Sequence, residues 1–156
     1  MSQFTAAADL RGGDFLFERL REEVARAQRH RLPLACLLFR VTAGADVDDA
    51  TAQRLTHAAS LLTRHLVRGS DVVALLGYGR FGVLANTTQD GALALAEALS
   101  RELLSFEFTH QGRHLDLELS YGASQLDDGK TPLGLLEEAR AALDERGAVR
   151  QAQGQS

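Results

Sequence analysis

Apolar residues recur along the chain with two different periods, and segments of the two kinds alternate. In four segments the apolar positions lie three or four residues apart, which is typical of a helix that buries one face. In the segments between them, apolar residues form short runs or alternate with polar ones, as in β-strands. The pattern therefore predicts an α+β domain, with a central five-stranded, mainly antiparallel sheet covered by four helices. The predicted helices lie around residues 14–30, 55–66, 92–103 and 132–147, and the predicted strands around 32–41, 71–76, 79–85, 106–109 and 115–121.

Two of the predicted connections are short turns. Gly77-Tyr78 separates two strand-like runs, and a glycine at the first of two linking residues is favoured in a type II′ hairpin turn. Further along, residues 106–109 are expected to pair with the alternating strand 115–121 across a turn at Gly112. Both turns join neighbours in sequence, so they predict antiparallel pairing.

Helix-start signals help to set the domain boundaries. Asp14 precedes the first helical period and is the predicted N-cap of the first helix. Thr131 followed by Pro132 has the form of an N-cap and a first helical position, and opens the last helix. The polar end of the chain has nothing to bury. We therefore expect an N-terminal lead-in at 1–13, one domain at 14–149 and a flexible tail at 150–156.

Composition and charge exclude several classes of protein. A chain of 156 residues with 45% hydrophobic residues is long enough for one domain with a core. Its net charge of −4 is too mild to drive non-specific binding to nucleic acid or to an anionic membrane. The longest apolar run, Leu32–Phe39, is far shorter than the roughly 20 residues of a spanning helix, and no signal peptide is visible. We expect a cytoplasmic protein with no nucleic-acid partner and no membrane insertion.

The most specific motif of the chain begins at Arg68. Arg68 and Asp71 form an Arg-x-x-Asp pair. After five intervening residues comes the run Gly77, Tyr78, Gly79, Arg80 and Phe81, followed by an apolar strand. This spacing resembles that of the GGDEF domain of diguanylate cyclases, in which an Arg-x-x-Asp motif precedes the Gly-Gly-Asp/Glu-Glu-Phe hairpin. The resemblance extends over residues 15–147. We call residues 77–81 the signature hairpin.

The resemblance also shows what this chain lacks. Family members join two nucleoside triphosphates with the help of metal ions, which need carboxylate ligands from the first strand and from the hairpin. Arg40 and Thr42 stand at the first-strand positions, and Gly79 and Arg80 stand at the acidic positions of the hairpin. Tyr78 adds a side chain where the family brings the backbone close to the nucleotide. The resemblance therefore implies a degenerate, catalytically inactive domain with no metal ion and no cofactor.

The Arg-x-x-Asp pair is the part of the motif that this chain retains. In the family this pair is the core of the inhibitory site for cyclic di-GMP. An arginine offers a planar fork for a guanine edge or a phosphate, and a carboxylate accepts from guanine N1–H and N2–H₂. The resemblance implies a cyclic di-GMP receptor in bacterial second-messenger signalling, of the kind that controls exopolysaccharide output or surface behaviour. Its ligand residues would be Arg68, Asp71 and, as an additional arginine on the third predicted helix, Arg101.

Other interpretations of the same residues stay open. Arg68 also suits a helix C-terminus, where a cation is favoured, Asp71 suits the start of a strand, and Arg101 suits an exposed helix surface. The main alternative function is a ligand-free scaffold that dimerises or docks on a protein partner. Binding of GTP or GDP at the signature hairpin is a third. The partners these interpretations allow are cyclic di-GMP, a second copy of the chain, and a protein of a signalling or secretion complex.

Overall fold

The computed structural model describes residues 12–43, 48–66, 71–77, 79–105, 107–145 and 149–150, and within them the predicted α+β class with four helices is confirmed. A five-stranded sheet has the order β2-β3-β1-β6-β7, and β4 and β5 form a separate two-stranded ribbon. Every strand pair in these described ranges is antiparallel. The elements in chain order are α2 (Gly12–His30), β1 (Ala35–Thr42), α3 (Asp49–Leu66), β2 (Val72–Gly77), β3 (Arg80–Ala85), α4 (Gln89–Ser105), β4 (Phe108–His110), β5 (Arg113–Leu115), β6 (Glu118–Gln125), α5 (Pro132–Glu145) and β7 (Val149–Arg150).

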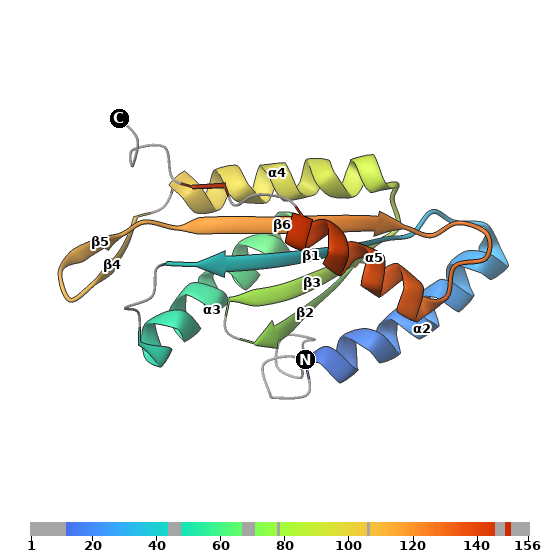
Figure 1. Cartoon of the computed structure of the whole chain (residues 1–156), viewed down its shortest axis with the longest axis horizontal. Helices are drawn as coiled ribbons and strands as arrows, with labels where there is room; N and C mark the ends of the chain where they lie inside the picture. The colour runs from blue at the N-terminus through green and yellow to red at the C-terminus, as the bar shows by residue number, and fades with distance from the viewer. Residues whose placement is uncertain are drawn as a thin grey trace.

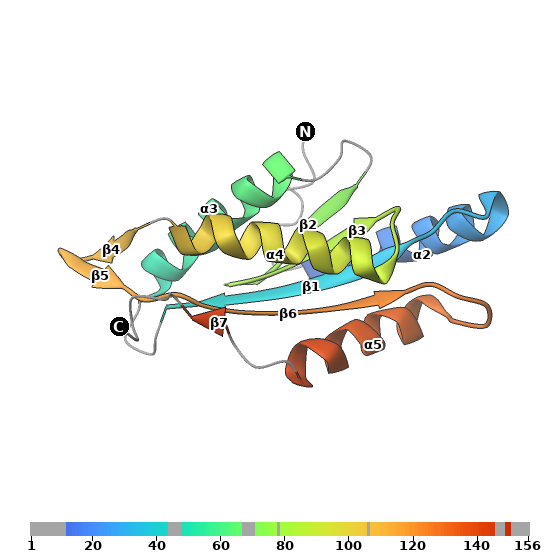
Figure 2. The same cartoon turned by 90° about the horizontal axis from the view of Figure 1, so that it is seen from above.

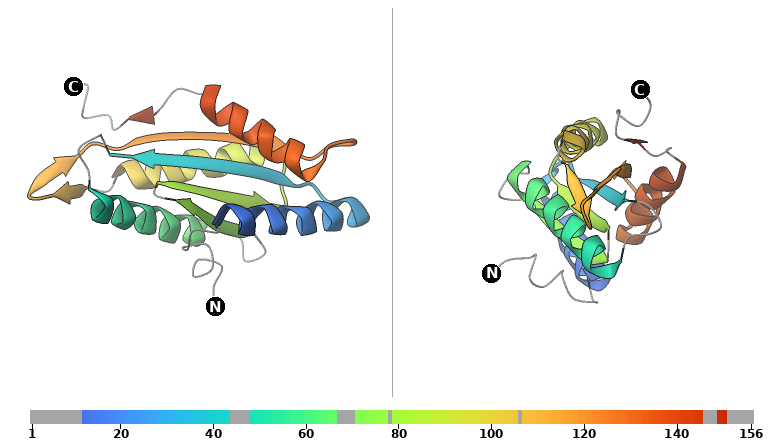
Figure 3. Two further views of the ribbon diagram at one scale, coloured as in Figure 1. Left: turned by 60° about the horizontal axis from the view of Figure 1, so that its bottom comes forward. Right: turned by 90° about the vertical axis from the view of Figure 1, so that its left-hand side faces the viewer.

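The helices cover both faces of the sheet (Figure 1). Helices α2 and α5 contact each other, and they pack on β2, β3, β1 and β6. Helices α3 and α4 also contact each other and pack on the same sheet. Figure 2 shows α4 and α5 on opposite sides of β1 and β6, and the end-on view in Figure 3 shows α3 and α5 on opposite sides of the sheet. The fold is thus three layers, with the central strand β1 buried between helices.

The middle of the core is a row of aromatic residues across three strands. Phe39 on β1 is directly paired with Phe81 on β3 and with Tyr121 on β6. The rings of Phe39 and Phe81 stack with centroids 5.1 Å apart, and the ring of Tyr121 lies 5.3 Å from that of Phe39. Such pairs contribute about 0.5–1.5 kcal/mol each beyond their buried area. Phe81 therefore fixes the signature hairpin to the centre of the sheet.

One of the two predicted N-caps is confirmed. Thr131 Oγ1 accepts a hydrogen bond from the Gly134 amide at 2.9 Å, which confirms Thr131 as an N-cap. Helix α2, however, begins at Gly12, so the prediction that Asp14 is its N-cap is wrong, and Asp14 lies in the first turn. An acidic residue is favoured in either place, so the sequence signal does not separate them. None of the helices in the described ranges is both long and apolar enough to cross a membrane.

The strands at one end of the molecule differ from the prediction. The turn at Gly112 is confirmed, since Phe108 pairs with Leu115 around it. This pair belongs to the separate ribbon, because the chain leaves the strand conformation at residues 116–117, before β6 begins. The expected pairing of residues 106–109 with 115–121 is therefore confirmed at Phe108 and Leu115, and it is wrong for β6, which pairs with β1 and β7 instead. The fifth strand of the main sheet is β7, in which Arg150 pairs with Glu118. Residues 151–156 of the expected tail lie outside the described residues.

Candidate functional site

The turn of the signature hairpin lies one residue later than predicted. Strand β2 extends through Gly77, which pairs with Arg80, and the register shifts between Leu75 and Gly77. The extra residue in β2 is a bulge, so Gly77 belongs to the strand and Gly79 lies in the turn. Gly79 has a φ of 75°, a conformation that favours glycine. The prediction of a type II′ turn at Gly77-Tyr78 is therefore wrong, and Tyr78 itself lies outside the described residues.

Gly79 is held tightly against β1 and α3. Its carbonyl accepts a hydrogen bond from the Val41 amide at 2.6 Å, and its own amide donates to Thr56 Oγ1. A Cβ atom added to Gly79 would lie only 2.3 Å from the carbonyl oxygen of Val41. A side chain at this position therefore needs the hairpin backbone to move. Thr56 carries no signal in the sequence, since nothing in the spacing of residues places helix α3 against the hairpin.

The side chains at the expected metal positions do not fit a divalent cation. Arg40 and Arg80 are directly paired across β1 and β3, and Thr42 is exposed at the end of β1. Hard cations such as Mg²⁺ are bound by carboxylate oxygens, whereas these three residues present two guanidinium groups and one hydroxyl. Within the described part of the chain, no group of three or more His, Cys, Asp and Glu residues is placed to hold a metal ion.

A cavity of about 270 Å³ lies beside the hairpin, between α2, α5 and the strands. Two of its lining residues, Arg40 and Arg80, belong to the motif positions in the sequence, whereas Arg140 and Asp144 of α5 belong to no motif identified there. Helical spacing places Arg140 and Asp144 on one side of α5, but only the packing of α5 on the sheet brings them to the strands. We call this cavity the arginine pocket; it is lined by Leu16, Leu38, Phe39, Arg40, Leu76, Arg80, Leu136, Arg140, Leu143 and Asp144.

A second cavity, of about 180 Å³, lies beside Asp71. Asp71 immediately precedes β2 and is only 6% exposed. The cavity is formed where α3 and β3 end and where β2 and α4 begin. Arg68, its expected partner, lies outside the described residues. We call this cavity the Asp71 pocket; it is lined by Leu66, Asp71, Ala85, Asn86, Thr87, Gly91 and Leu95.

Hydrogen bonds fix the polar wall of the Asp71 pocket. The Asn86 side chain accepts from Arg26 at 3.0 Å and donates to the Pro33 carbonyl at 3.2 Å. A Cβ atom on Gly91 would lie 2.0 Å from Thr87 Oγ1, so glycine lets α4 begin close to that side chain. A glycine in the first turn of a helix is unfavourable by itself. In the sequence, this glycine is the feature that points to a close contact at the wall of the pocket.

Arg101 lies later in α4 than the segment that lines the Asp71 pocket. Its side chain is exposed, and it is not one of the residues that line this cavity. Of the three expected ligand residues, the structure thus places Asp71 in a pocket and Arg101 on the helix surface outside it.

Solved structures with the same fold are GGDEF domains. The active GGEEF domain of a diguanylate cyclase from Vibrio cholerae superposes with a TM-score of 0.75 and 21% identity, over 85% of this chain and 87% of that one. The GGDEF domain of DgcB from Caulobacter crescentus, in complex with c-di-GMP, gives 0.71 and 14% identity over 81% and 79%. The diguanylate cyclase SiaD from Pseudomonas aeruginosa, in complex with its activator SiaC, gives 0.69 and 23% over 85% and 53%.

The sequence itself also matches a family model. No curated protein matches the chain significantly. The family model described as "Diguanylate cyclase, GGDEF domain" matches residues 7–153, almost the whole sequence. The chain belongs to the GGDEF domain family.

Proposed function

We propose that this GGDEF domain is a catalytically inactive receptor for cyclic di-GMP. The observation that carries the proposal is the buried carboxylate of Asp71 beside a pocket of about 180 Å³. Asp71 is also the acidic residue of the Arg-x-x-Asp motif, in the family's spacing from the signature hairpin.

Two features of the signature hairpin and the neighbouring strand β1 support the loss of catalysis. The positions that supply metal-binding carboxylates in the family hold Arg40, Thr42, Gly79 and Arg80. Gly79 in addition has no room for a Cβ atom beneath the Val41 carbonyl. A cation would meet two guanidinium groups here, and this is unfavourable at any distance within the site. The family's usual activity is diguanylate cyclase, and we infer that this member has lost it.

The size of the Asp71 pocket suits one part of a dinucleotide. Pockets that enclose a whole small molecule usually measure about 300–1,000 Å³, so a cavity of about 180 Å³ suits a single base. In this proposal Asp71 accepts hydrogen bonds from the N1–H and N2–H₂ groups of a guanine. Arg68, three residues earlier in the motif, donates to a guanine edge or to a phosphate. Arg101 adds a weaker contact from outside the pocket.

The alternative is a ligand-free scaffold that binds a protein or a second copy of the chain. The DgcB complex shows that protein of the same fold with c-di-GMP, and the SiaD complex shows that one with an activator protein. The two most exposed leucines described here are Leu61 on α3 and Leu133 on α5, each 52% exposed. These helices lie on opposite faces of the sheet (Figure 3), so the two leucines do not form one apolar patch. The receptor is therefore the better supported function.

Titration calorimetry with cyclic di-GMP tests the proposal directly. Saturable binding at micromolar or lower concentration is the expected result, with cyclic di-AMP as the control ligand that keeps the backbone and changes the bases. Absence of heat at high cyclic di-GMP concentration would overturn the receptor proposal and favour the scaffold.

A further inference from the structure

We propose that the arginine pocket binds a phosphate-bearing small molecule directly through Arg40, Arg80 and Arg140, without a metal ion. This inference concerns the cavity beside the hairpin and is independent of the cyclic di-GMP site at Asp71. It starts from the mismatch described above, in which positive side chains stand where a metal site needs carboxylates.

The pocket carries a local positive charge on an acidic chain. Its lining contains three arginines and one carboxylate, that of Asp144, whereas the whole chain has a formal net charge of −4. A cleft lined by one sign of charge concentrates its field, which raises the local concentration of ions of the opposite sign. The charge is therefore a property of this pocket and not of the surface in general.

The register of the sheet places two of these charges directly opposite each other. Arg40 on β1 is paired with Arg80 on β3, and directly opposed side chains have Cβ atoms about 4.5–5.5 Å apart. Like charges in this position destabilise a sheet. An anion that contacts both guanidinium groups removes that repulsion, so bound anion and folded domain stabilise each other.

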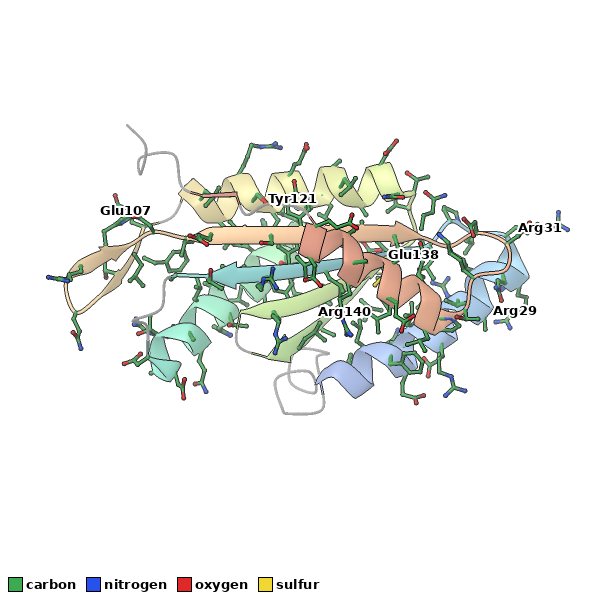
Figure 4. The ribbon with its side chains drawn as sticks, in the orientation of Figure 1. Arg29, Arg31, Glu107, Tyr121, Glu138 and Arg140 are labelled. Carbon is green, nitrogen blue, oxygen red and sulfur yellow. The ribbon has the colours of Figure 1, made fainter. Side chains whose placement is uncertain are left out.

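The carboxylates near the pocket neutralise these arginines only in part. Arg40 Nη1 and Asp144 Oδ1 are 3.8 Å apart, which is an ion pair but longer than a hydrogen bond, and the two side chains are 41% and 62% exposed. Neither Arg80 nor Arg140 has a carboxylate partner among the residues that the structure describes. Glu138, labelled with Arg140 on α5 in Figure 4, is 2.8 Å from Lys130 instead. Guanidinium donors therefore remain available in the pocket.

The rest of the lining strengthens such an interaction. Leucine side chains from α2, β1, β2 and α5 contribute to the walls, and an apolar surrounding makes a charge-assisted hydrogen bond stronger than it is in water. The planar guanidinium group binds two phosphate oxygens at once. With about 270 Å³ of space, the pocket suits a pyrophosphate-sized anion, free or as part of a nucleotide.

Inorganic pyrophosphate in the presence of EDTA is the first probe, and its binding is measured by calorimetry and by thermal melting. The proposal predicts saturable binding without metal, weaker binding at high salt, and a rise in melting temperature. A nucleoside diphosphate in EDTA forms the second arm. If it binds more tightly than pyrophosphate, the ligand is a nucleotide, and equal affinities indicate that the phosphates alone are recognised. Failure of both probes to bind in EDTA, or binding only after Mg²⁺ is added, would contradict the proposal.

The double variant Arg40→Gln/Arg80→Gln separates this role from a structural one. Charge-assisted hydrogen bonds contribute about 1.5–3 kcal/mol each, so the loss of one weakens binding by roughly 10- to 150-fold. The pyrophosphate affinity of the double variant should fall by at least this factor. Its unliganded melting temperature should be unchanged or higher, because the repulsion between the two arginines is gone. Arg140→Gln should also weaken binding.

Arg113→Gln is the matched control, since Arg113 is an exposed arginine on β5 that does not line the pocket. This variant, like Asp71→Asn, should bind pyrophosphate as the unchanged domain does. Unchanged affinity in the double variant would overturn the proposal, and this result would leave the cyclic di-GMP proposal at Asp71 untouched.

Discussion

Gly79 and Val41 approach each other so closely that no side chain fits between them. A Cβ atom on Gly79 would lie 2.3 Å from the Val41 carbonyl oxygen, and the same glycine has a φ of 75°. Both conditions oppose a carboxylate at the first acidic position of the signature hairpin. The difference from the family's signature is therefore built into the backbone of the hairpin as well as into its side chains.

Substitution of Gly79 should destabilise the domain more than substitution of a comparable glycine elsewhere. Gly112 has a φ of 77° but nothing within 4 Å of its Cβ position, so Gly112→Ala measures the conformational cost alone. That cost is about 1–2 kcal/mol. Gly79→Ala should lower the free energy of unfolding by more than this, since it adds the contact with Val41. Urea denaturation of the two variants is the measurement, and equal losses would show that the hairpin relaxes freely.

No cyclase activity is expected. With GTP and either Mg²⁺ or Mn²⁺, the domain should form no cyclic di-GMP above a blank without protein, because arginines and a glycine replace the metal ligands. Chromatography of the reaction mixture is the measurement, and the active GGEEF domain from Vibrio cholerae is a suitable positive control. Sustained turnover would show that other carboxylates of the chain bind the metal.

Cys36 should give the stability of the domain a measurable alkaline dependence. It is fully buried in β1, and burial raises the pKa of its thiol from an ordinary 9.0 to about 12. Between these values the unfolded chain has released a proton that the folded domain keeps. The contribution of the protonated thiol to the free energy of unfolding is therefore fully present below about pH 9. It falls as the pH rises toward 12, by about 1.4 kcal/mol per pH unit.

Cys36→Ala lacks the titrating thiol and serves as the reference. The difference in free energy of unfolding between the two proteins should change above pH 9, as measured by urea denaturation at a series of pH values. Parallel curves would show that the thiol titrates normally in the folded domain.

Asp71→Asn is expected to change ligand selectivity more than fold. The amide keeps the shape of the side chain but removes its charge and half of its acceptor capacity. The preference for cyclic di-GMP over cyclic di-AMP should therefore fall, as measured by calorimetry with both ligands. Arg101→Ala should have a smaller effect, since Arg101 does not line the Asp71 pocket. Unaltered selectivity in Asp71→Asn would exclude this carboxylate from base recognition.

The sequence predicts the helices and the central strands because each has a long and regular pattern of apolar residues. A cap residue, Thr131, also marks the start of the last helix. It does not predict the position of the hairpin turn, because Gly77 and Gly79 both suit a turn and only the bulge in β2 selects between them. The two-residue strand β7 has no period at all, and the alternating residues 115–121 do not reveal the interruption between β5 and β6.

The candidate sites likewise contain some residues that the sequence identifies and others that only the fold brings together. Arg40, Arg80 and Asp71 are identified from motif spacing, which is local. The pairing of Arg40 with Arg80, and the approach of Arg140 from α5, depend on strand register and helix packing. These long-range relationships leave no mark in the spacing of residues along the chain, so the arginine pocket appears only in the folded domain.

The most direct test of the central claim is a calorimetric titration of cyclic di-GMP into the unchanged domain and into the Arg68→Ala/Asp71→Ala double variant. Each lost charge-assisted contact should weaken binding by roughly 10- to 150-fold, so the double variant should bind at least that much more weakly. Circular dichroism confirms that the variant is folded. Equal affinity in the two proteins, or no binding by the unchanged domain, would contradict the account.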